Sequence, residues 1–183
     1  MEAVSVATAT YTLADLERMP DDGMHREILH GELIELPLAK LGQTRTAMKI
    51  VASLLSYLGH HCEIGTVLVA GFLLDASSWL QPDVAVLKPE QIAVPDSDYA
   101  PGAPLVAFEV ASPSEAGVDS EAKSLAYLEA GARAVVWIYP KTRTLHILGE
   151  GERRLAEHDT LELPSILPGW TSPSATFSPV NRA

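Results

Sequence analysis

Apolar and polar residues change their spacing several times along the chain, and each change marks a different predicted element. From Gln43 to about His61 the apolar residues recur every three or four positions, which predicts one long amphipathic helix. Residues 134–139 (AVVWIY) are apolar throughout, which predicts a buried strand with residues 142–148 as its hairpin partner. Residues 26–36 alternate in polarity about a His-Gly pair, which predicts a second hairpin.

Turn-forming residues separate the other predicted elements. Residues 20–23 (PDDG) end a short helix at 12–19, which has Thr12 as its N-cap. Gly131 follows a helix from Asp119 to Ala130, in the position where a left-handed C-cap is expected. The remaining predictions are a strand at 63–75 with a kink near Gly71, strands at 81–87 and 105–111, and a surface connection at 88–104.

Helices and strands both occur, and the helix and strand within residues 119–139 form a compact αβ unit. With 183 residues, 47% of them hydrophobic, the chain has the size of one globular α/β domain. We expect a flexible N-terminus at 1–10, a single domain at 11–170 and an irregular C-terminal tail at 171–183.

The net charge of −11 argues against a broad basic surface that grips nucleic acid non-specifically. The single cysteine, Cys62, excludes an intrachain disulfide, and the first ten residues lack the basic residues of a secretory signal. No apolar run reaches the length of about 18 residues that a membrane span requires. We therefore expect a soluble, cytoplasmic protein.

Two apolar segments each carry one carboxylate, Asp83 and Glu109. Burying an ionised acid without a partner is costly, so a cation between the two acids is the leading interpretation. If the two strands are neighbours, alternation of side chains lets the acids converge. Two carboxylates with waters and a phosphate suit Mg²⁺. The alternative is that each acid lies on a solvated face or, at Asp83 after Pro82, accepts backbone hydrogen bonds.

Lys123 is the candidate amine for this site. On the predicted helix it lies one turn before Tyr127 and shares a face with it, so it can be aimed at the carboxylates and orient or deprotonate a water. The alternative is a surface lysine paired with Glu121 or Glu129. Glu27 has the same kind of surface alternative and a weaker claim to the site.

Several blocks in this order resemble the Uma-two family of restriction endonucleases, within the PD-(D/E)XK nuclease superfamily. They include residues 26–33 (REILHGEL), 81–84 (QPDV) and 108–114 (FEVASPS), followed by Lys123, Tyr127, Ala130-Gly131 and Val136-Trp137-Ile138. The likeness runs from about Tyr11 to Trp170.

The resemblance implies a mixed central β-sheet flanked by helices, with a restriction-endonuclease-like core, and a homodimer. It implies an endonuclease that hydrolyses DNA phosphodiester bonds with Mg²⁺, or with Mn²⁺ in its place. Asp83 and Glu109 are then metal ligands, Lys123 the positioned amine and Glu27 an auxiliary acid. The chain departs from the family pattern in two places: Ala111 stands where the superfamily usually has its lysine, and no histidine lies near Thr44.

Other functions remain open alongside this hypothesis. The missing histidine and the acidic charge favour a catalytically inactive nuclease-fold binding module as the alternative, and a metal-dependent phosphoesterase for smaller substrates ranks third. Adjacent His60, His61 and Cys62 lack a partner pair for zinc, and Ser112 and Ser114 lack a glycine elbow. The three tryptophans are interpreted as packing residues.

Overall fold

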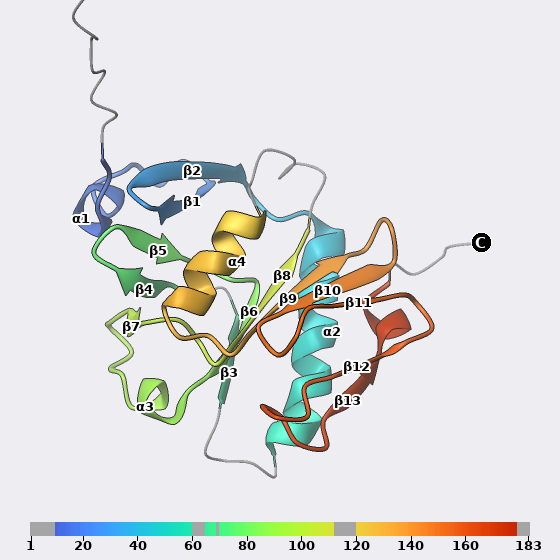
Figure 1. The fold of residues 1–183 in the computed structure, drawn as a ribbon. Helices are drawn as coiled ribbons and strands as arrows, with labels where there is room; N and C mark the ends of the chain where they lie inside the picture. The colour runs from blue at the N-terminus through green and yellow to red at the C-terminus, as the bar shows by residue number, and fades with distance from the viewer. Residues whose placement is uncertain (1–9, 60–64, 69, 112–119, 179–183) are drawn as a thin grey trace, which may run out of the picture.

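The centre of the protein is a six-stranded mixed sheet. Figure 1 shows how its strands lie between the helices in the computed structural model. The structure describes residues 10–59, 65–68, 70–111 and 120–178. Strands β8 and β9 are parallel, and the other neighbouring pairs are antiparallel, so the predicted mixed sheet is confirmed. In the order β11-β10-β9-β8-β6-β3, its strands are Arg153–Leu155, Thr144–Leu148, Ala134–Tyr139, Val106–Val110, Val84–Leu87 and Gly65–Leu68.

A second sheet of five strands lies beside the first. Its order is β2-β1-β5-β4-β7, with bounds Glu32–Pro37, Met24–Leu29, Ser78–Leu80, Phe72–Asp75 and Ala100–Pro101. The predicted hairpin is β1 and β2, and its turn residues His30 (φ 52°) and Gly31 (φ 80°) both have the left-handed backbone that a tight hairpin turn requires.

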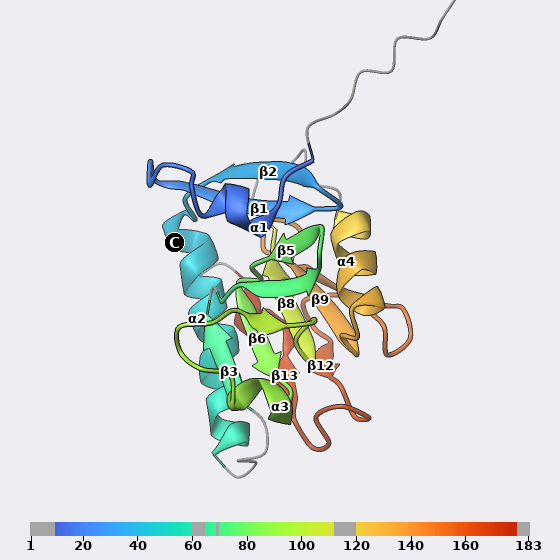
Figure 2. The ribbon, with the colours of Figure 1, turned by 90° about the vertical axis from the view of Figure 1, so that its left-hand side faces the viewer.

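Helices cover both faces of the central sheet. Helix α2 (Leu41–Leu58) packs on one face, while α4 (Ser120–Glu129) and the second sheet cover the other, as Figure 2 shows. Alternation along β8 divides its side chains between the two layers: Phe108 points to the α2 side, and Ala107 and Glu109 point to the α4 side. The remaining helices are short, α1 (Leu13–Leu16) and α3 (Pro89–Ile92).

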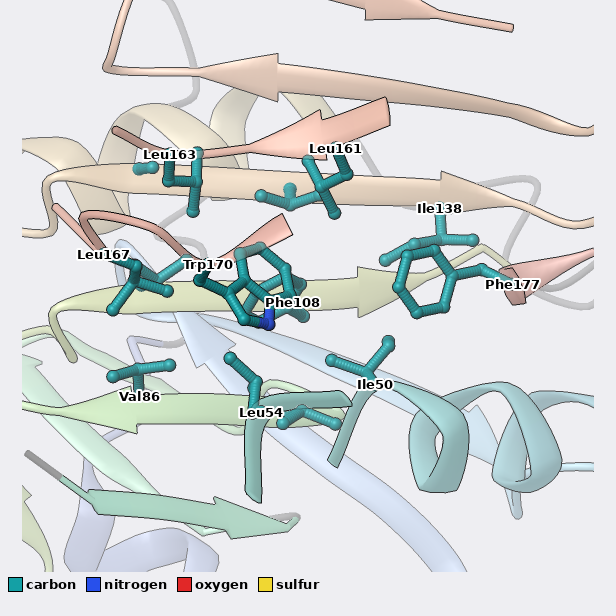
Figure 3. Packing of buried hydrophobic residues seen from close by; sticks show 14 of the residues in the cluster. Ile50, Leu54, Val86, Phe108, Ile138, Leu161, Leu163, Leu167, Trp170 and Phe177 are labelled. Carbon is teal, nitrogen blue, oxygen red and sulfur yellow. The ribbon is translucent and has the colours of Figure 1, made fainter. Parts of the chain in front are cut away.

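The C-terminal segment completes the core on the α2 side. Strands β12 (Thr160–Glu162) and β13 (Thr171–Pro173) pair, and a 3-10 helix follows at Ser174–Phe177. Trp170 meets Phe108 edge to face with ring centroids 6.2 Å apart, and Phe177 is 1% exposed (Figure 3). The expectation of an irregular tail is therefore wrong for residues 171–178, because these aromatic side chains cover sheet surface that α2 leaves open.

The predicted single strand at 63–75 is also wrong. The chain forms two strands there, β3 and β4, which belong to different sheets. The break falls at Gly71, where a Cβ atom would lie 2.3 Å from Cζ2 of Trp79. Only glycine lets the backbone pass this close to the indole.

The segments around the acids differ slightly from prediction. Strand β6 begins at Val84, so Asp83 lies in the turn before it. The connection at 88–104 contains α3 and β7, and it buries Gln91 to 4% exposure, so it is more than a surface loop. The interpretations of His60-His61-Cys62, Ser112, Ser114 and the Asp119 N-cap fall outside the described residues. None of the helices in the described ranges is both long and apolar enough to cross a bilayer.

Candidate active site

Strand pairing brings the two predicted acids together. Strands β6 and β8 are antiparallel neighbours with Val84 opposite Phe108, so continuing the register by one residue places Asp83 across from Glu109. The next pair on that face is Ala85 and Ala107. These small side chains leave room for α4 and the second sheet to approach, which turns the acidic end of the two strands into a pocket.

Asp83 uses its two carboxylate oxygens differently. Oδ2 accepts a hydrogen bond from the backbone N–H of Val110 at 2.7 Å, which is the contact that the alternative interpretation of Asp83 predicted. Oδ1 accepts a bond from Nε2 of Gln43 at 3.4 Å. Gln43, at the start of α2, was not identified from the sequence, because a polar residue in the first turn of an amphipathic helix is unremarkable there.

Lys123 joins the two glutamates. Its Nζ lies 2.9 Å from Glu27 Oε2 and 2.9 Å from Glu109 Oε1. The exposed fractions of Glu27, Glu109 and Lys123 are 0%, 5% and 3%, so all three ionisable groups are buried. The alternative of a surface lysine is wrong, and Glu27 lies in the centre of the cluster rather than on the surface.

Tyr127 and Lys123 act on the same oxygen of Glu109. The Tyr127 hydroxyl donates to Glu109 Oε1 at 3.0 Å, and Lys123 lies against that oxygen from the preceding helical turn. The lysine also lies 5.9 Å from the centre of the Trp137 ring, whose Nε1 donates to Ser124 Oγ at 2.8 Å. Lys123 and Tyr127 therefore share a helical face as predicted, and together they fix one carboxylate oxygen.

The site carries three carboxyl groups and one ammonium group. Burial raises the pKa of Glu109 to about 8 against the opposing charge of Lys123, and the charges of Glu27 and Asp83 add to the rise. Burial also acts to raise the pKa of Glu27, but the Lys123 charge and hydrogen bonds from His25 and the Gln81 amide lower it to about 2. At neutral pH Glu109 therefore keeps its proton, and the Glu27 carboxylate is paired with the Lys123 ammonium group.

A pocket of about 140 Å³ opens onto these groups. Glu27, Asp83, Glu109 and Lys123 all line it, and apolar residues 36–39 form part of its rim. The sequence interpretation did not identify His25, whose Nε2 lies 3.6 Å from Glu27 Oε1. The sequence indicated only that His25 lies two residues before Glu27 on a strand and therefore on the same face.

The donor set fits a hard divalent cation that keeps part of its water shell. Within the described ranges, no three acidic, histidine or cysteine side chains lie close enough to surround an ion by themselves. Asp83 and Glu109 supply two carboxylates, and waters and a phosphate oxygen of a substrate would complete six-fold coordination, as Mg²⁺ prefers. Such an ion would displace the proton that burial holds on Glu109.

Comparison with known proteins bears on the fold and the family. The family model Uma2, described as "Putative restriction endonuclease", matches residues 13–178. Among solved structures the chain is similar to "a putative nuclease belonging to DUF820" from Anabaena variabilis ATCC 29413. The TM-score is 0.76 at 16% identity, over 91% of this chain and 97% of that one. At this identity the likeness shows a shared fold, which agrees with the predicted nuclease-like α/β core. No curated protein matches the chain.

Proposed function

Because the chain belongs to the Uma2 family, we propose that it is a Mg²⁺-dependent endonuclease that hydrolyses DNA phosphodiester bonds. Asp83 and Glu109 are the proposed metal ligands. The observation that carries the proposal is the meeting of Asp83, Glu109, Glu27 and Lys123, from four separate parts of the chain, at one pocket. The pocket that opens onto the carboxyl groups of Asp83 and Glu109 supports a bound divalent cation over a purely structural ion pair.

The residues divide the work of such a reaction. Bound Mg²⁺ would supply positive charge to the phosphate and lower the pKa of a water. Glu109 has Oε1 held by Tyr127 and Lys123, so Oε2 is its oxygen for a ligand. Burial acts to lower the pKa of Lys123, but the Glu109 and Glu27 charges raise it above its ordinary value, so the amine keeps its proton. Lys123 then stabilises negative charge on the phosphate rather than abstracting a proton.

Plasmid nicking tests the proposal. The wild type is expected to nick supercoiled plasmid with Mg²⁺ or Mn²⁺ but not with EDTA. Asp83→Asn and Glu109→Gln should each lower the rate about a hundredfold or more, because each puts a neutral amide where the metal-bound state needs an anionic oxygen ligand. Asp96→Asn and Glu162→Gln, at exposed positions, are the matched controls and should nick like the wild type.

The outcomes separate the rival functions. Nicking that survives in Glu109→Gln from a clean preparation refutes the assigned site. A wild type that neither nicks DNA nor binds Mn²⁺ in calorimetry is the inactive binding module instead. Hydrolysis of nucleotides without hydrolysis of DNA indicates the smaller-substrate phosphoesterase.

A homodimer is part of the same proposal. Leu41, Met48 and Leu55 lie seven residues apart on α2 and are 63%, 51% and 56% exposed. Such a stripe supports antiparallel pairing of two α2 helices about Met48, which would place Leu41 of each copy against Leu55 of the other. Light scattering should give twice the mass of 19.6 kDa, and Met48→Glu should give a monomer. A wild-type monomer contradicts this assembly.

A further inference from the structure

One row of side chains crosses the central sheet on the α4 side. The row starts at Glu109, and strand pairing places Trp137 beside it on β9, His146 on β10 and Arg154 on β11. These four residues occupy matching positions on four neighbouring strands. With strands about 4.8 Å apart, the backbone at Arg154 lies roughly 14 Å from that at Glu109. The row thus leads from the acidic pocket to the edge of the sheet.

A second pocket, of about 240 Å³, lies along the outer part of this row. Trp137 lines both this pocket and the acidic one, so the two share a wall. Tyr139 also lines it, half-buried, with its ring stacked on Trp137 at a centroid distance of 6.3 Å and an interplanar angle of 24°. An aromatic surface therefore lies next to the proposed cleavage site.

The polar lining of the second pocket is mixed. Arg154 is exposed and makes no ion pair with any of the described residues. His146 Nε2 lies 3.0 Å from Glu152 Oε1, and Glu121 brings a second carboxylate. Two acids disfavour a free anion inside the pocket. A nucleotide fits this lining better. Its base can donate hydrogen bonds to the carboxylates and stack on the Tyr139 ring, and its phosphate can pair with the Arg154 guanidinium.

We propose that the second pocket binds the nucleotide that flanks the cleaved phosphodiester bond, with its phosphate on Arg154 and its base against Tyr139. This inference rests on the proposed function, because the ligand is the strand that the acidic pocket cuts. Trp137 forms the wall between the two subsites, so neighbouring nucleotides of the strand would lie on either side of it. The chain has a net charge of −11, and Arg154 supplies positive charge for the phosphate at the edge of the sheet.

Fluorescence anisotropy tests the proposal. It measures binding of a labelled single-stranded DNA of about twelve nucleotides, with Ca²⁺ present and over a range of salt concentrations. Arg154→Ala should weaken binding about fivefold at low salt and lower the slope of log K against log[salt] by about 0.7, the value for one lost phosphate contact. Tyr139→Leu should weaken binding about tenfold with an unchanged slope, because stacking is lost without charge. Arg18→Ala removes a 75% exposed guanidinium elsewhere and is the control.

Two results would overturn the inference: no binding by the wild type, or an Arg154→Ala variant whose affinity and slope match those of Arg18→Ala. Both readouts are independent of cleavage. A wild type that fails to nick DNA but shows the two signatures contradicts the proposed function and leaves the binding site standing. If the wild type nicks DNA but neither substitution changes binding, the proposed function stands and the proposed binding site is wrong.

Discussion

Replacing Lys123 with methionine tests whether the buried charges form one ion-paired unit. Methionine keeps the apolar stem of lysine but removes the ammonium group that lies 2.9 Å from both Glu27 Oε2 and Glu109 Oε1. Glu27 is fully buried and therefore loses its main compensating charge. Removing one partner of a buried pair typically costs about 3–5 kcal/mol.

The structure allows a sharper estimate through the protonation of Glu27. Without Lys123, the folded variant avoids a buried unpaired carboxylate by keeping Glu27 protonated, whereas the unfolded chain has the ordinary pKa of 4.5. Holding that proton at pH 7 costs about 3.4 kcal/mol, at 1.36 kcal/mol per pH unit. We therefore expect a loss of about 3 kcal/mol at pH 7, falling to less than about 1 kcal/mol at pH 5.

The sign of the pH dependence distinguishes this reasoning from simple misfolding. In the variant the folded pKa of Glu27 lies above the unfolded value, so stability is lost as the pH rises above about 4.5. In the wild type that pKa is lowered to about 2, so Glu27 does not make the free energy of unfolding depend on pH between pH 5 and pH 7. Glu109 is protonated in both proteins over most of this range, so its contribution to the difference in their free energies of unfolding largely cancels.

Urea unfolding in EDTA at both pH values measures the difference. Lys141→Met removes an exposed lysine and is the matched control, with an expected change within about 0.5 kcal/mol. A loss at Lys123 of less than about 1 kcal/mol at pH 7 would refute the reasoning, because that is the size of an exposed pair. An equal loss at pH 5 and pH 7 would also refute it.

Three further substitutions test other parts of the structure. Tyr127→Phe removes the donor that lies 3.0 Å from Glu109 Oε1 and should weaken Mn²⁺ binding about tenfold in calorimetry; an unchanged affinity would show that the hydroxyl does not position the ligand. Phe177→Ala should cost about 3–5 kcal/mol in urea unfolding, since the ring is 1% exposed, and a cost near zero would remove the C-terminal segment from the core. Gly71→Ala should cost about 1–3 kcal/mol because the Trp79 indole must move. Its control is Gly42→Ala, whose new Cβ meets nothing within 4 Å, and equal stability of the two variants would contradict the close approach.

The sequence predicted the elements whose signals are local. The amphipathic period identified α2, the unbroken apolar run identified β9, and the turn residues identified the β1–β2 hairpin. The same local pattern singled out Asp83 and Glu109, and the structure places both at one pocket, while their role as metal ligands stays a prediction.

Tertiary structure decided which distant residues meet. Glu27 lies in the second sheet, and no local pattern indicated that it would be buried beside Lys123. The row from Glu109 to Arg154 depends on strand order and register, which long-range pairing sets.

Packing likewise decided the two elements that were mispredicted. At Gly71, between β3 and β4, the Trp79 indole packs against the backbone, and in the C-terminal segment Trp170 and Phe177 cover the central sheet. Spacing along a chain records which side of an element is apolar, but the surface that covers that side comes from elsewhere in the sequence. Elements were therefore readable from the sequence alone, whereas contacts between them required the folded chain.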